Sequence, residues 1–96
     1  MIYRQGDVLI VKVEQEFDGA NEQSAILAYG EATGHHHKLE GTVEIVREQG
    51  EISMFRVVEA TPLTHQEHAT ITVEPGVYRV IRQREYQRGE IQRVLD

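Results

Sequence analysis

Residues branched at Cβ dominate the apolar part of this chain and restrict what it can fold into. Val and Ile number 19 against only 5 Leu, and Thr adds 6 more. Branching at Cβ limits the rotamers of a side chain in a helix, whereas it packs well on a pleated sheet. The composition therefore predicts strands.

The pattern along the chain supports an all-β fold. Short runs that are apolar or alternate apolar with polar residues recur about every 8–12 residues between turn residues, a spacing typical of small barrels and sandwiches. Glu48-Gln-Gly-Glu51 joins two alternating segments and predicts a hairpin, with Gly50 free to adopt a positive φ. We predict a single all-β domain over residues 1–96, a small antiparallel barrel or sandwich of about eight short strands. The expected strands are residues 7–13, 24–29, 35–39, 42–47, 52–58, 68–73, 77–83 and 89–95.

The core should be built from the inward-facing apolar residues of these strands. In residues 68–73, for example, Ala69, Ile71 and Val73 should face the core, because side chains alternate along a strand. The residues expected to supply much of the core are Val8, Ile10, Ile26, Val43, Ile45, Phe55, Val57, Ile71, Val73, Val80 and Ile81.

Composition also excludes several classes of protein. The 96 residues include no Cys, which rules out disulfide scaffolds, Cys-type zinc fingers, iron–sulfur proteins and cysteine nucleophiles. Apolar runs such as Val8 to Val11 are far short of the roughly 20 residues of a membrane span. The first residues lack the basic, apolar and small-residue regions of a signal peptide, so we expect a cytoplasmic protein.

The charge balance bears on partners. The net charge of −6 opposes binding to nucleic acid and to anionic lipid. The basic residues near the end of the chain are all Arg, and pairing with the acidic remainder explains them better than a nucleic-acid patch does. They are Arg79, Arg82, Arg84, Arg88 and Arg93.

Five His residues fall into two tight groups, His35-His-His37 and His65-Gln-Glu-His68. In a strand His35 and His37 share one face and His36 takes the other, so we expect His36 in solvent. A bulge or turn at Gln66-Glu67 would let His65 and His68 point the same way. The two pairs would then supply four nitrogen ligands, or three ligands and an open position.

Those four residues, His35, His37, His65 and His68, are the predicted metal ligands. Zinc is the first choice, because four neutral nitrogens fill its tetrahedral shell, and iron, manganese, nickel and copper also accept imidazole. Glu67 and Glu31 are candidate general bases, oxygen ligands or acceptors for imidazole N–H groups. The alternative is that each His group is simply a solvated loop.

Other catalytic patterns are absent from the sequence. No Gly-x-Ser-x-Gly elbow occurs, and Gly30-Glu-Ala-Thr-Gly34 lacks the Gly-Lys-Ser/Thr ending of a phosphate-binding loop. No substrate can be assigned from these residues.

Several stretches resemble a family of small, functionally uncharacterised bacterial and phage proteins. The resemblance runs nearly end to end and implies that the histidines are the functional focus, but it implies no activity or substrate. The matching pieces are Gln5-Gly-Asp-Val-Leu, Gly30-Glu-Ala-Thr-Gly-His-x-His37, Leu63-x-His-x-Glu-His68, Pro75-Gly-x-Tyr78 and Gln83-Arg-Glu-Tyr86. The His-x-His pair is also faintly similar to the first cupin motif, which implies an analogy of architecture only.

Two functions follow as hypotheses. The first is a small metal-binding β-barrel protein whose multi-His site could support metal-assisted chemistry. The second is a non-enzymatic protein-interaction module, a phage or mobile-element accessory with surface histidines. A small domain with open strand edges is also expected to form a homodimer, to which residues 90–95 could add a strand.

Overall fold

The computed structural model describes residues 1–29 and 34–82, which form eight strands and contain no helix. Accordingly, these residues contain no helix that could cross a membrane. The strands are β1 (Ile2–Gln5), β2 (Val8–Val13), β3 (Ala20–Tyr29), β4 (His36–Glu48), β5 (Glu51–Val57), β6 (Thr61–Thr64), β7 (Ile71–Val73) and β8 (Gly76–Arg82).

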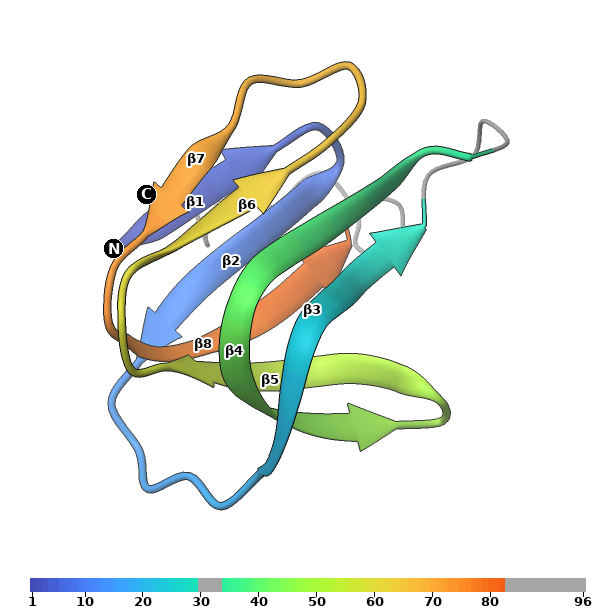
Figure 1. Ribbon diagram of the computed structural model, residues 1–96. Coiled ribbons are helices and arrows are strands. Elements are labelled where there is room, and N and C mark those ends of the chain that lie inside the picture. Colours follow the sequence, from blue (N-terminus) through green and yellow to red (C-terminus); the bar gives the residue numbers. More distant parts are fainter. Residues whose placement is uncertain (30–33, 83–96) are drawn as a thin grey trace, which may run out of the picture.

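All strand pairs are antiparallel and belong to one curled sheet (Figure 1). The strand order is β1-β2-β8-β5-β4-β6-β7, and β3 pairs with the remaining edge of β4. The two ends of this order, β1 and β7, lie side by side, so the sheet forms a nearly closed barrel. The predicted all-β architecture is confirmed.

The long strand β4 organises the barrel. Its first part, at Lys38 and Leu39, pairs with β6, whereas the part from Val43 onward pairs with β5. The backbone N–H of Gly41 donates to Oγ1 of Thr61 at 2.7 Å, between these two parts. The prediction of separate strands at 35–39 and 42–47 is therefore wrong, because the chain passes through Gly41 without a break and exchanges one partner for another.

Two hairpin turns depend on positive φ values. Gln49 and Gly50 have φ of 54° and 81° between β4 and β5, which confirms the predicted hairpin and is typical of a type I′ turn. Gly6 has φ of 58° between β1 and β2, and Asp7 completes this two-residue turn. A positive φ at the first position only is typical of a type II′ turn. The second turn places Asp7 at one end of the barrel.

The core fills the barrel with the residues that alternation predicts, with three exceptions. Ile26, Ile71 and Val80 are only half-buried. In β3 the register shifts between Gln23 and Ala25, where Ser24 has a φ of 57°, so Leu27 rather than Ile26 faces inward. The remaining expected core residues are buried, together with Leu9, Ala25, Leu27, Ala28, Leu39, Ile52, Leu63 and Tyr78.

Two other predicted strands differ from the structure or fall outside the described residues. The alternating segment 68–73 is a strand only at Ile71–Val73, and Ala69 is exposed in the preceding loop. Strands β1 and β6 are absent from the sequence-based expectation, and β6 contains Pro62, a residue that is rare inside strands. The predicted strand at 89–95 lies outside the described residues.

Candidate metal centre

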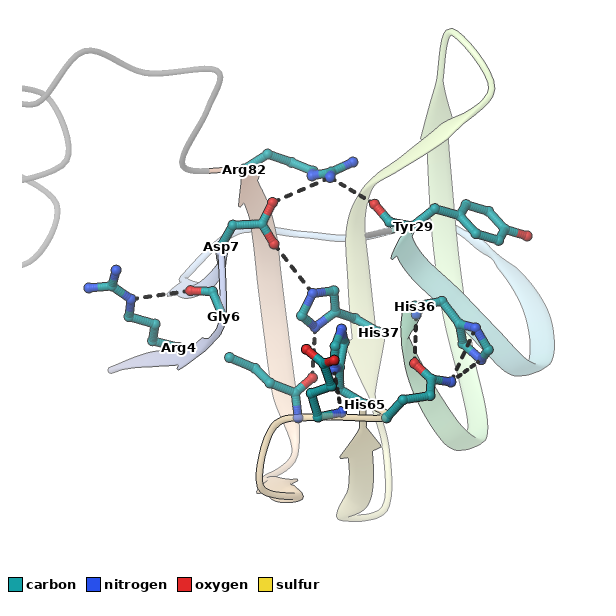
Figure 2. Close-up of polar contacts among 11 residues, drawn as sticks. Arg4, Gly6, Asp7, Tyr29, His36, His37, His65 and Arg82 are labelled. Atoms are coloured by element: carbon teal, nitrogen blue, oxygen red, sulfur yellow. Dashed lines mark hydrogen bonds and ion pairs between the residues drawn. The ribbon is translucent and has the colours of Figure 1, made fainter. Parts of the chain in front are cut away.

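Three segments that are distant in sequence meet at one end of the barrel. They are the β1–β2 turn at Gly6-Asp7, the start of β4 at His35–His37, and the loop between β6 and β7 that carries His65 and His68. Figure 2 shows side chains of all three segments pointing toward one another, with Arg82 at the end of β8 beside them.

Strand register explains why the two histidine groups meet. In the β4–β6 pair, Leu39 lies opposite Leu63 and Lys38 opposite Thr64. The next step of this antiparallel register brings His37 opposite His65. The ring centres of these two residues are 4.4 Å apart.

His65 lies at the centre of the group of four imidazoles. Its ring centre is 4.6 Å from that of His68 and 5.6 Å from that of His35. The bend at Gln66-Glu67 thus brings His65 and His68 to the same side. Two imidazoles bound to one tetrahedral zinc ion, with Zn–N bonds near 2 Å, have ring centres about 5 Å apart. The three spacings around His65 are close to this value, whereas the ring centres of His37 and His68 are 6.3 Å apart.

His36 faces away from these rings, as strand alternation predicts. Its backbone N–H donates to Oε1 of Gln66 at 2.8 Å, and its ring lies edge-on to Tyr29, with the centres 6.3 Å apart. The middle histidine of the run is therefore separate from the group formed by its two neighbours.

His37 is the buried member of the group, with 1% of its surface exposed, and Gln5 holds its ring. The Gln5 amide nitrogen donates to the carbonyl oxygens of Leu63 and Ala69, at 2.9 and 3.0 Å. The amide oxygen therefore faces Nδ1 of His37, at 2.8 Å. Because that oxygen can only accept, His37 carries its proton on Nδ1.

The other nitrogen of His37 faces a carboxylate. Nε2 of His37 is 3.4 Å from Oδ1 of Asp7, and Oδ2 of the same side chain accepts from Nη2 of Arg82, also at 3.4 Å (Figure 2). Arg82 is buried and also donates to the carbonyl oxygen of Tyr29 at 2.9 Å. Asp7 thus lies between a buried guanidinium and an imidazole.

The surroundings favour the neutral forms of His37 and His65 and the charged form of Asp7. Burial, followed by the proximity of His65, lowers the pKa of His37 to about 4, although Asp7 opposes the shift. Burial and the neighbouring His68 and His35 lower the pKa of His65 as well. Partial burial works to raise the pKa of Asp7, but Arg82 outweighs it and the net pKa is below the ordinary value. Neutral imidazole and ionised carboxylate are the forms that bind metal ions.

The comparisons with known proteins give a family but no activity. A family model described as "Domain of unknown function (DUF8820)" matches residues 4–83. The chain belongs to this family. No curated protein and no solved structure matches it. The DUF8820 match covers every residue of the site described above, from Gln5 to Arg82.

Glu67 contacts two histidines of the group, His65 and His35. The Glu67 backbone N–H donates to Nδ1 of His65 at 3.0 Å, so neutral His65 carries its proton on Nε2. Nε2 of His35 is 3.7 Å from Oε1 of Glu67. Within residues 1–29 and 34–82, no three His, Asp or Glu side chains are set in a geometry that would hold an ion as they stand. Loading an ion would therefore require His65 to release the Glu67 N–H.

The sequence pointed to the histidines as site residues but gave no role to Gln5, Gly6 and Asp7. These residues lie some thirty positions from the nearest histidine, and their turn becomes part of the site only through barrel closure. The only signal in the sequence was their inclusion in the pieces that carry the family resemblance. Glu31, the other proposed base, lies outside the described residues.

Proposed function

We propose that this protein binds a divalent metal ion at the end of the barrel where His35, His37, His65 and His68 meet. The observation that carries the proposal is the spacing of the rings around His65, with centres 4.4, 4.6 and 5.6 Å away. Zinc is the first candidate, because four neutral nitrogens fill its preferred tetrahedral shell.

The position of the site supports the same function. His37 is buried on a strand, which would fix one ligand, while His65 and His68 lie in the loop between β6 and β7. If three imidazoles bind, a water molecule completes the shell and becomes a nucleophile at neutral pH. Glu67, which is exposed beside His35, is then the general base available among the described residues.

The test is the metal content and zinc affinity of protein purified without a tag at pH 8. We expect one zinc ion per chain and weaker binding in His35→Ala and His68→Ala. His36→Ala is the matched control, because it removes an imidazole from the same run but from the opposite face. That variant should bind zinc as the wild type does.

The outcome also decides between the two functional classes. Less than about 0.1 metal ion per chain, with no binding on titration, would overturn the proposal, since an intact site loads its ion by mass action. A non-enzymatic interaction module would then be the better description. Equal loss of affinity in His36→Ala would show that zinc binds elsewhere.

A further inference from the structure

The hydrogen bonds around His37 leave one contact unexplained. Gln5 is buried, with 2% of its surface exposed, and all its polar atoms are used. Because its nitrogen serves two carbonyl oxygens, its oxygen can only be the atom that meets Nδ1 of His37. The proton therefore sits on Nδ1, and Nε2 presents a lone pair.

That lone pair faces Oδ1 of Asp7 at 3.4 Å. Two electron-pair donors face each other here with no proton between them. An imidazolium would remove the conflict by donating to the carboxylate. A cation that accepts both electron pairs also removes it. The 3.4 Å separation also equals the distance of about 3.4 Å between two ligand atoms that bind one tetrahedral ion through bonds of about 2.0–2.1 Å.

We infer that Asp7 is a metal ligand and that Gln5 positions His37 to bind the same ion through Nε2. This inference rests on the proposed function, because it names ligands of that same site. It replaces a purely histidine ligand set by one that combines imidazoles with a carboxylate.

Two further features of the structure support this assignment. Arg82 donates to the far oxygen of Asp7, which orients the carboxylate and leaves Oδ1 directed at His37. The turn that carries Asp7 also touches His68, since a Cβ at Gly6 would lie 2.6 Å from Nε2 of His68. Outer hydrogen bonds of this kind commonly fix the orientation and tautomer of a metal-bound histidine.

The proposed site therefore has two parts, one on the strands and the hairpin turn and one in the loop between β6 and β7. Gln5, Asp7 and His37 come from a hairpin turn and two strands, and their geometry is defined before an ion arrives. His65 and His68 lie in the loop between β6 and β7 and complete the shell when His65 releases the Glu67 N–H. A carboxylate in the shell also makes manganese and iron better candidates than four imidazoles alone would.

The first experiment measures the tautomer of His37 in the metal-free wild-type protein by ¹⁵N NMR of the imidazole nitrogens at pH 7.5. We expect the neutral form with its proton on Nδ1. A proton on Nε2, or a doubly protonated ring, would overturn the inference, and neither result depends on whether the protein binds metal.

The second experiment compares the zinc affinity of Asp7→Asn with that of the wild type by calorimetry, on protein shown to be folded. Asn keeps the shape of the side chain but loses its charge, and we expect affinity to fall at least tenfold, the scale on which outer-shell partners already act. Asp18→Asn is the matched control, since Asp18 is exposed in the loop before β3.

Gln5 is tested in the same titration. Gln5→Met removes the oxygen that faces Nδ1 of His37 and should lower the zinc affinity about 10–100-fold. If Gln5→Met does not fold, the tautomer measurement and Asp7→Asn still decide the matter. Unchanged affinity in Asp7→Asn would overturn this inference alone, whereas absence of zinc binding by the wild type would overturn the proposed function itself.

Discussion

His37 brings together burial, hydrogen bonding and proximity to charge in one side chain. A histidine with 1% exposure on a barrel strand would ordinarily be a poor choice for stability, because burial opposes its charged form. Gln5 satisfies one nitrogen and Asp7 stands at the other. The chain thus maintains a neutral imidazole near physiological pH at a buried position.

This arrangement predicts a loss of stability in mild acid. The pKa of His37 is about 4 in the fold against 6.5 when unfolded, so the unfolded chain binds the extra proton first as pH falls. Stability is complete above pH 6.5 and declines between pH 6.5 and 4, by up to about 3 kcal/mol from this group. Urea unfolding in chelator at a series of pH values measures it.

The matched variants for this titration are His37→Asn and His36→Asn. Asn at position 37 retains an N–H for Gln5 and cannot be protonated, so the decline between pH 6.5 and 4 should become shallower, and the part due to His65 should remain. His36→Asn should keep the wild-type slope. A slope that is the same in all three proteins would contradict the assignment of the decline to His37.

Position 6 also restricts the side chain that it can carry, because Gly6 has a positive φ and lies close to His68. A methyl group there would lie 2.6 Å from Nε2 of His68, and the φ of 58° is strained for any side chain. Gly6→Ala should therefore cost about 1–2 kcal/mol through the backbone and also displace His68. Zinc affinity should fall with it.

Gly50→Ala separates the two effects in that experiment. Gly50 also has a positive φ, of 81°, but a Cβ there would meet nothing within 4 Å. Chemical unfolding should show similar losses of stability for both variants, and calorimetry should show weaker zinc binding only for Gly6→Ala. Equal zinc affinities would mean that His68 is not held against this turn.

At the scale of elements, β8 illustrates how a strand buries a polar aromatic side chain. Tyr78 is fully buried and stacks on Phe55 of β5, with ring centres 5.3 Å apart, and its hydroxyl donates to the carbonyl oxygen of Glu74 at 2.6 Å. Burial raises the pKa of Tyr78 to about 12, and the nearby Tyr3 hydroxyl adds to the shift.

Alkaline unfolding should therefore report on β8. The unfolded chain loses the Tyr78 proton near pH 10 while the fold retains it to about 12, so stability falls across this range by up to about 2–3 kcal/mol. In Tyr78→Phe this decline should shrink, although the variant starts about 1 kcal/mol lower for want of the hydrogen bond to Glu74. Tyr29→Phe, at an exposed ring, should match the wild type.

The same scale shows how much of this protein could be predicted from its sequence. Alternation and turn chemistry identified the β4–β5 hairpin because both are local properties. They failed at Ile26, where a bulge reverses the parity of the strand, and at Gly41, where β4 continues without a break. Bulges and exchanges of partner depend on neighbouring strands, which a single sequence does not reveal.

The residues of the site also fall into those that local patterns predicted and those that they did not. Alternation placed His35 and His37 together and His36 apart, and a bend at Gln66-Glu67 was expected to align His65 with His68. The roles of Gln5 and Asp7 arise only when β1 comes to lie beside the β6–β7 hairpin. Contacts across a barrel closure join residues that share no local pattern.

At the scale of the whole molecule, the core is small, so a bound ion would add a large share of the free energy of unfolding. An ion that binds only the folded form adds about 2.7 kcal/mol at a hundredfold excess over Kd. In a domain of this size each kcal/mol raises the melting temperature by about 4–8 °C, so saturating zinc should raise it by about 10–20 °C. Thermal unfolding at pH 8 with zinc or with chelator measures the shift.

The double variant His35→Ala/His68→Ala provides the control for that comparison. It should melt near the chelator-treated wild type whether or not zinc is present, because the added stability comes from binding. Identical melting of the wild type in zinc and in chelator would count against a metal site in the folded protein.

The open edge of β3 bears on assembly. Within residues 1–29 and 34–82, β3 pairs only with β4, so its outer edge has no strand beside it. Edges of this kind favour pairing with a second copy, and closed two-fold dimers are the commonest result. Light scattering at micromolar concentration should give twice the 11.0 kDa of one chain, and a mass of a single chain would contradict the dimer.

The bridge made by Gln5 has a kinetic consequence. Among the described residues, β1 and β7 form no ladder, and the Gln5 amide spans the seam between β1 and the β6–β7 hairpin instead. A few side-chain hydrogen bonds open more readily than a row of backbone hydrogen bonds, so we expect local opening of the barrel wall to concentrate at this seam. Each such opening should release the His37 ring from Gln5 and allow it to rotate. The residence time of a bound ion should then follow the frequency of opening, and a substitution that tightens the seam would slow release without altering any ligand.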